Sequence, residues 1–167
     1  KSFDVIKTRE PGGSSTAEQI RKLIFSKKSI NFDKLTDFYL MNAARNEHFK
    51  KTLFPAKKKN KIVISDRFTD STYAYQVIGN KIDKKINLIN QKYILKNFKP
   101  NLTIILKANF NTIRFRINNR KNNNKFDWLK INFYKKAQNA YLLQARKNKN
   151  YLVFDSSKNT TILEKKN

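Results

Sequence analysis

Short apolar segments alternate along the chain with longer stretches in which apolar residues recur every three or four positions. Alternating or β-branched runs predict strands at residues 3–6, 61–65, 102–106 and 151–154. The periodic stretches predict helices at about residues 16–24, 33–50, 68–78, 83–97, 109–118 and 127–147. Because strands alternate with helices, we expect an α/β fold in which a parallel sheet is flanked by helices.

The first predicted strand ends in an abrupt charged turn, Thr8-Arg9-Glu10-Pro11-Gly12-Gly13. Two of the three glycines and one of the three prolines of the chain lie in this turn, and Pro-Gly-Gly terminates a strand. The helix that follows carries Arg21. We therefore expect Arg9, Glu10 and Arg21 at the carboxyl edge of a strand, where open α/β sheets bind their ligands.

Polar residues also mark the ends of later elements. Asp33 is expected to cap the helix of residues 33–50, and Asn109 or Asn111 the helix that reaches about Asn118. The buried strand 61–65 is followed directly by Asp66 and Arg67. These two charged side chains are therefore expected at the same sheet edge as the first turn.

Basic residues outnumber acidic ones by 37 to 12, which gives a formal net charge of +25. Such a charge leaves a basic nucleic-acid-binding protein open as an alternative. However, the lysines are spread along the chain, and the aromatic residues follow helix and strand periodicities. Enrichment in Lys, Asn, Ile and Phe indicates a codon bias toward A and T. Arginine is rarer and lies beside the recognisable segments, which favours bidentate phosphate binding.

The length of 167 residues predicts a single domain spanning residues 1–167. There is no cysteine and His48 is the one histidine, which excludes disulfides, thiolate metal sites and histidine clusters. No apolar run approaches the roughly 18 residues that cross a membrane, and no signal-peptide pattern opens the chain. We expect a cytoplasmic protein without a membrane partner.

Three segments, in this order and spacing, closely resemble bacterial thymidylate kinases, which transfer a phosphoryl group from ATP to dTMP. They are Thr8 to Gly13 with Arg21, Ala43 to His48, and Asp66 to Phe68 with Ser71 to Gln76. The resemblance covers nearly the whole chain. It implies a P-loop kinase-like fold, Mg²⁺ as cofactor, and dTMP and ATP as small-molecule partners.

The resemblance also implies roles for individual residues. Arg45 and Arg67 would contact the acceptor phosphate, Asp66 would position Mg²⁺ through water or substrate oxygens, and Arg21 would lie near the base. The other expected substrate-binding residues are Glu10, Pro11, Met41, Ser71, Thr72, Tyr75 and Gln76. Met41 departs from the pattern, because the family usually has a phenylalanine there that stacks on thymine. Methionine can still cover an aromatic face.

Residues 114–127 resemble the family's lid. Asn124-Lys125-Phe126-Asp127 matches an Asn/Asp-Arg-x-Asp/Glu pattern, with lysine in place of the usual arginine. We expect Arg120 and Lys125 to act as catalytic cations that neutralise charge on the donor phosphates, with Arg116 and Lys121 as alternatives.

A homodimer is a further implication of the resemblance, because the family pairs through helices equivalent to residues 33–50 and 68–97. Leu35, Phe38, Leu88 and Ile89 are the expected apolar contacts of that interface.

The phosphate-binding motif G-x-x-x-x-G-K-[ST] does not occur in the 167 residues. The sequence begins within what resembles the family's second strand. We therefore expect the first strand, phosphate loop and first helix, about 30 residues, to be absent from this N-terminally truncated chain, and its activity to be impaired. A kinase of another nucleoside monophosphate is the second alternative.

Overall fold

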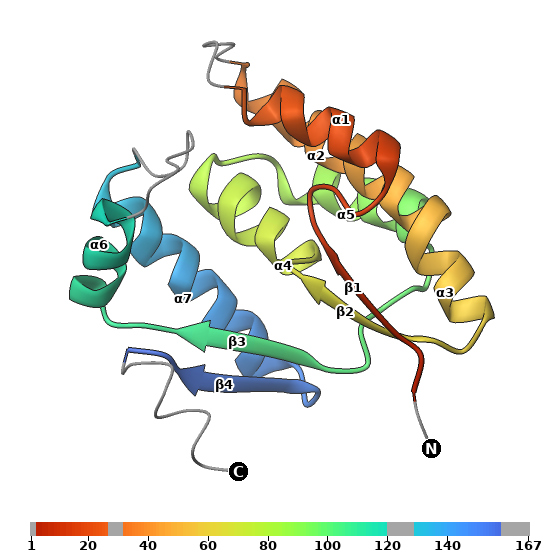
Figure 1. Cartoon of the computed structure of the whole chain (residues 1–167). Helices are drawn as coiled ribbons and strands as arrows, with labels where there is room; N and C mark the ends of the chain where they lie inside the picture. Colours follow the sequence, from red (N-terminus) through yellow and green to blue (C-terminus); the bar gives the residue numbers. More distant parts are fainter. Residues whose placement is uncertain (1–2, 27–31, 120–128, 158–167) are drawn as a thin grey trace. The chain divides into compact units, whose positions relative to one another are not determined.

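The computed structural model describes residues 3–26, 32–119 and 129–157 (Figure 1). The chain divides into two compact units, Lys1–Lys99 and Pro100–Asn167. The first unit contains β1 (Val5–Arg9), α1 (Ser15–Ile24), α2 (Lys34–His48), the π-helical η1 (Phe49–Leu53), α3 (Phe54–Lys58), β2 (Ile62–Asp66), α4 (Thr69–Thr72), the π-helical η2 (Tyr73–Gly79) and α5 (Lys84–Leu95). The second contains β3 (Thr103–Lys107), α6 (Phe110–Asn118), α7 (Ile131–Lys147) and β4 (Tyr151–Asp155).

In the first unit, β1 and β2 form a parallel pair whose register brings the two charged motifs together. Arg9 lies opposite Asp66, and the backbone N–H of Glu10 donates to the carbonyl of Asp66 at 2.9 Å. The chain therefore leaves both strands at one edge, as the sequence predicted. This edge carries the turn after β1 and the start of α4.

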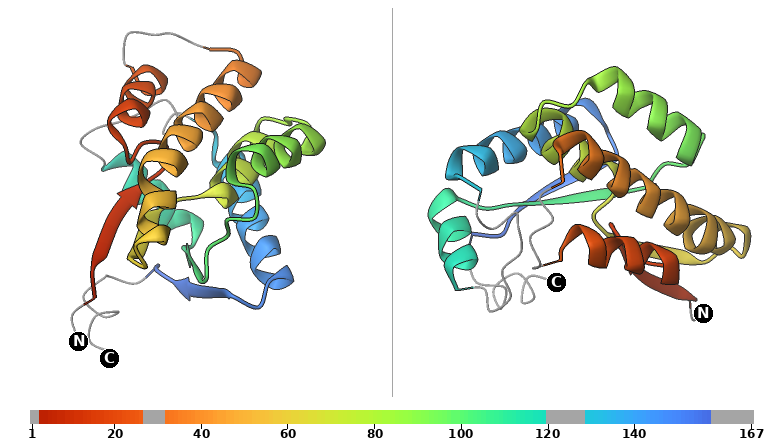
Figure 2. Two further views of the ribbon diagram at one scale, coloured as in Figure 1. Left: turned by 90° about the vertical axis from the view of Figure 1, so that its right-hand side faces the viewer. Right: turned by 90° about the horizontal axis from the view of Figure 1, so that it is seen from above.

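Helix caps explain where the helices of this unit begin. Asp33 caps α2, as predicted, by accepting a hydrogen bond from the backbone N–H of Leu35. Ser14 caps α1 in the same way, through the N–H of Ala17. Helix α1 packs on α2, which also packs against α5. Figure 2 shows α2 continuing through η1 into α3 as one long helix.

The apolar core of the first unit is centred on Phe49, Leu53 and Leu95, with Phe68 and Phe98 packed against them. It lies where η1 meets α5. Because Phe68 is the first residue after Asp66 and Arg67, this packing anchors the segment that carries both charged side chains.

One expected interface residue needs correction. Phe38 is fully buried within the unit, at 0% exposure, and cannot contribute to a surface patch on the folded chain. Leu35, Leu88 and Ile89 remain exposed, at 40%, 53% and 55%. The apolar stripe of α2 turns Phe38 inward because the helix packs on both α1 and α5.

In the second unit, β3 and β4 are also parallel, with Thr103 opposite Tyr151. Helix α7 packs against both strands, and α6 packs against α7. Asn109 is the residue that caps α6, since its side chain accepts from the N–H of Thr112.

The predicted strands and helices are therefore confirmed, with ends shifted by a few residues, and the strand pairs are parallel. In place of one sheet, the described residues form two separate two-stranded sheets. The predicted helix 68–78 is a short α-helical turn followed by a π-helical one, a form that often accompanies functional sites. No helix in the described part of the chain has the length and apolar character to cross a bilayer.

Candidate functional site

The turn after β1 takes its shape from two glycines. Gly12 and Gly13 have φ of 130° and 82°, a region that residues with a Cβ rarely adopt. A Cβ at Gly13 would collide with the Thr8 hydroxyl and the ring of His48. Glycine is therefore required for this turn to lie directly against α2.

A buried group of charged side chains lies beneath this turn. Glu10 and Arg45 are 4% and 3% exposed, and His48 is 0% exposed. One carboxylate oxygen of Glu10 accepts from Nε of Arg45 at 2.8 Å, and the other lies 3.1 Å from Nδ1 of His48. Burial acts to raise the pKa of Glu10, but Arg45 and His48 together hold that pKa below its ordinary value. Glu10 is therefore a carboxylate at neutral pH.

Arg45 keeps one hydrogen-bonding group in reserve. Its Nη2 donates to Oγ1 of the buried Thr72 at 2.9 Å, and Nε is taken by Glu10. Its Nη1 is buried and has no hydrogen-bond partner within the described residues. A buried guanidinium N–H without an acceptor is costly, and an anionic ligand would satisfy it. This unpaired donor marks the place where a phosphate oxygen fits.

Three arginines crowd the same edge of the sheet. Arg21 donates from Nη1 to the carbonyl of Pro11 at 2.7 Å, while Arg9 forms a 2.9 Å ion pair with Glu18. Burial and the positive charges of Arg9 and Arg67 lower the pKa of the Arg21 guanidinium. That lowering shows that the positive charges are close enough to disfavour one another. An anion bound at this edge would relieve the repulsion.

Arg67 is held by the start of α4 and by η2. Its backbone has a φ of 68°, which is unfavourable for a residue with a side chain and is typical of functional positions. Its Nη1 lies 3.5 Å from the hydroxyl of Ser71, and its guanidinium lies 5.4 Å from the ring centroid of Tyr75. Residues 67–75 thus gather one guanidinium, one hydroxyl and one aromatic ring.

The structure accordingly sorts the expected site residues into groups. Glu10, Arg45 and Thr72 make direct contacts, and Arg67, Ser71 and Tyr75 form the second set. Met41 on α2 and Gln76 on η2 are buried, at 9% and 3% exposure. Arg120 and Lys125 lie outside the described residues. Arg116, an alternative lid cation, donates to the carbonyl of Ser156 at 2.6 Å in the second unit.

Asp66 is an exposed carboxylate at the end of β2. The described residues contain no group of three or more side chains that could hold a metal ion by themselves. Mg²⁺ typically keeps several waters and binds one or two carboxylates together with substrate phosphates. A single carboxylate beside a phosphate site therefore fits this ion, whereas an all-protein cage does not form.

Two participants in the buried group were not expected from the sequence. Thr8 opens the first motif and His48 closes the second, and a hydrogen bond of 2.7 Å joins them. Thr72 was expected beside the base, but its hydroxyl accepts from Arg45. No periodicity marks such contacts, since the Thr8–His48 partners are 40 residues apart.

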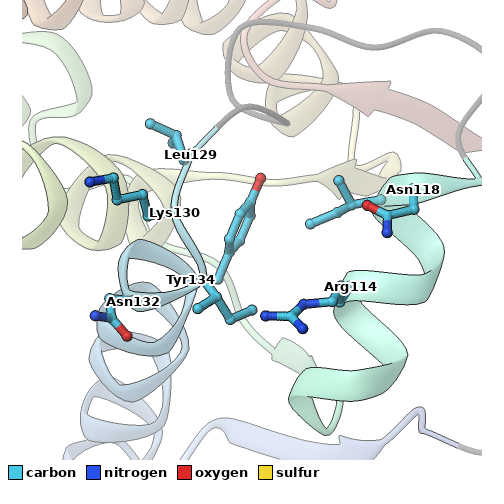
Figure 3. A pocket seen from close by; sticks show the side chains of 8 residues that line it. Arg114, Asn118, Leu129, Lys130, Asn132 and Tyr134 are labelled. Atoms are coloured by element: carbon cyan, nitrogen blue, oxygen red, sulfur yellow. The ribbon is translucent and has the colours of Figure 1, made fainter.

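A second cavity lies in the other unit, between α6 and the start of α7 (Figure 3). It has a volume of about 430 Å³ and is lined by Arg114, Ile117, Asn118, Leu129, Lys130, Ile131, Asn132 and Tyr134. Arg114 and Tyr134 point toward each other across it. It belongs to the region that resembles the lid.

Comparison with known proteins identifies the family. The family model described as thymidylate kinase matches residues 1–167. The chain is 39% identical to the thymidylate kinase of Mycoplasma capricolum subsp. capricolum, covering 94% of this chain and 75% of that protein. It is 38% identical to the thymidylate kinase of Mycoplasmoides gallisepticum, covering 93% and 73%. The crystal structure of thymidylate kinase from Ehrlichia chaffeensis matches with a TM-score of 0.73 at 29% identity, covering 94% and 72%. The chain therefore belongs to the thymidylate kinase family, whose members are ATP-dependent kinases.

Proposed function

We propose that the carboxyl edge of β1 and β2 binds dTMP with its phosphate between Arg45 and Arg67. The observation that carries this proposal is the buried, unpaired Nη1 of Arg45, in a pocket of charge that Glu10 alone does not neutralise. The exposed Arg67 supplies a second guanidinium, and Arg21 adds positive charge nearby. Two planar donors suit the oxygens of a phosphate monoester.

The base and sugar are assigned to the surrounding polar and apolar side chains. Ser71 and Gln76 supply hydroxyl and amide groups for the thymine edge, and Met41 covers a face of the base. Tyr75 packs near the deoxyribose, where its ring disfavours a 2′-hydroxyl by sterics. Pro11 lines the same cleft. The arginine-facing end of this arrangement takes the phosphate.

ATP is the phosphoryl donor in this proposal. The donor phosphates need a glycine-rich loop with a lysine, and the 167 residues contain no such motif. Arg120 and Lys125 of the lid neutralise charge that develops during transfer, and Asp66 holds Mg²⁺ through water or phosphate oxygens. Mg²⁺ supplies charge neutralisation between the donor and acceptor phosphates.

We also propose that both units belong to one kinase domain. The family model spans both of them, from residue 1 to residue 167. A cytoplasmic location remains a prediction from the sequence.

Addition of dTMP is expected to raise the melting temperature of the folded chain, because a ligand that binds only the native state stabilises it by mass action. At 100 times the dissociation constant, the gain is about 2.7 kcal/mol. For a domain of this size, that corresponds to about 5–10 °C. Thermal unfolding followed by circular dichroism measures the shift.

The same assay with dUMP, UMP and a single-stranded oligonucleotide separates the alternatives. We expect dTMP to give the largest shift and UMP the smallest. A larger shift with UMP would indicate a kinase of another nucleoside monophosphate. Stabilisation by the oligonucleotide, with no effect of dTMP, would instead support a nucleic-acid-binding protein.

A homodimer through the first unit is proposed from the exposed apolar residues Leu35 on α2 and Leu88 and Ile89 on α5. These two helices pack against each other, so both contribute to one surface region. Sedimentation equilibrium is expected to give the dimer mass, and a Leu88→Glu, Ile89→Glu variant the monomer mass. A well-folded monomer of the unmodified chain at high concentration would contradict the proposal.

A further inference from the structure

We propose that His48 is a positioning residue for the acceptor phosphate: it fixes the Glu10 carboxylate and thereby the direction of the unpaired Nη1 of Arg45. This inference rests on the proposed binding of dTMP at Arg45. It assigns to the histidine a role in ligand binding without contact to the ligand.

The contacts form a continuous chain from β1 across α2 to α4. Nε2 of His48 lies 2.7 Å from the hydroxyl of Thr8, and its Nδ1 lies 3.1 Å from Oε1 of Glu10. Oε2 of Glu10 accepts from Nε of Arg45 at 2.8 Å, and Nη2 of Arg45 donates to Thr72 at 2.9 Å. Of these, His48, Glu10, Arg45 and Thr72 are at most 4% exposed.

The chemistry of Glu10 fixes the direction of these hydrogen bonds. An ionised carboxylate only accepts, so Nδ1 of His48 carries a proton and donates it to Oε1. In the neutral imidazole, Nε2 then accepts from the Thr8 hydroxyl. Both ring nitrogens are thus engaged, and the ring cannot turn without breaking a buried hydrogen bond.

The consequence for Arg45 follows from how carboxylates pair with guanidinium groups. With Oε1 held by His48, Glu10 offers Arg45 a single oxygen, at Nε. Without His48, the carboxylate is free to swing into a bidentate pair, which guanidinium groups favour. It would then compete with Thr72 and the ligand for the remaining N–H groups of Arg45. His48 therefore keeps Nη1 available for the phosphate.

A purely structural role is the rival explanation, because the His48 ring also lies directly against Gly13. Two substitutions separate the roles. In His48→Asn, the amide lies near the position of Nδ1 and preserves the contact to Glu10. In His48→Gln, the amide reaches the position of Nε2 and preserves the contact to Thr8 while leaving Glu10 unheld. Neither variant is charged.

The measurement compares the dissociation constants of dTMP and thymidine, the same nucleoside without the phosphate, by titration calorimetry. We expect His48→Gln to weaken dTMP binding by about 10- to 100-fold, the usual effect of a lost hydrogen bond to a charged group. Thymidine binding should change by less than about twofold, the error of the comparison against that effect. His48→Asn should stay within about threefold of the unmodified chain for both. Lys84→Ala, an exposed change on α5, is the control.

The outcomes distinguish the two proposals. Failure of the folded, unmodified chain to bind dTMP overturns the proposed function itself. If that chain binds dTMP but His48→Gln weakens dTMP and thymidine equally, or neither, the positioning role is overturned. Equal losses in His48→Asn and His48→Gln overturn it as well.

If His48→Gln does not fold, Thr8→Val provides the same test by removing the hydroxyl that holds Nε2. A loss confined to dTMP supports the proposal. Unchanged dTMP binding in this variant overturns it.

Discussion

Replacing Arg67 with alanine is expected to remove most dTMP binding, at a cost of about 2–4 kcal/mol. This corresponds to a roughly 30- to 1000-fold higher dissociation constant. Arg67 is exposed at the end of β2, and its printed partners are the Ser71 hydroxyl at 3.5 Å and the ring of Tyr75. The fold should therefore survive the substitution. Titration calorimetry measures the loss, and the melting temperature without ligand reports on the fold.

Two matched variants sharpen this test. Lys84→Ala removes an exposed cation from α5 and should leave dTMP binding unchanged. Arg67→Lys keeps the charge but loses the planar fork, so its loss should be intermediate. Equal losses for Arg67→Ala and Lys84→Ala would show that the net charge of the chain, and not this site, attracts the nucleotide.

Arg45 is less suitable than Arg67 for this experiment, because it has two functions. Its removal would also leave Glu10 buried without its main partner, and breaking a buried pair costs about 3–5 kcal/mol. A loss of binding in Arg45→Ala would then be inseparable from a loss of folding. The exposed arginine reports on binding, whereas the buried one links binding to the stability of the turn.

A polypeptide consisting of these 167 residues alone is expected to transfer phosphate from ATP to dTMP at a negligible rate. Phosphoryl transfer depends on backbone N–H groups and a lysine placed around the β- and γ-phosphates. Loss of a single such donor typically costs 10²- to 10³-fold in rate, so loss of the whole cradle should exceed about 10³-fold. A coupled assay for ADP release, with Mg²⁺ present, measures the rate.

Adding a strand, a glycine-rich loop ending in Lys-Ser or Lys-Thr, and a helix ahead of residue 1 should restore activity in a Mg²⁺-dependent manner. The dTMP-induced thermal shift serves as the control, since it should be present with and without the added segment. An ordinary kinase rate from the 167 residues alone would mean that ATP is held by groups that the sequence does not reveal.

Local sequence signals determined the order and type of the elements. Asp33 and Asn109 each act on backbone N–H groups within three residues, so their capping roles were predictable from the sequence. Pro-Gly-Gly likewise ends β1 where the sequence indicates, because backbone conformation at glycine is a local property. The candidate residues of the sheet edge follow from where the strands end.

Only the tertiary structure decided which of these residues meet. Glu10 finds Arg45 and His48 across 35 and 38 residues of sequence, and Phe38 turns inward although the sequence allowed it on the surface. Such contacts depend on how α2 packs against the turn after β1, on α1 and on α5, and no local pattern encodes that packing. The sequence determined which side chains reach the sheet edge. Burial decided that Arg45 would be held by Glu10 on one side while its Nη1 remains unpaired.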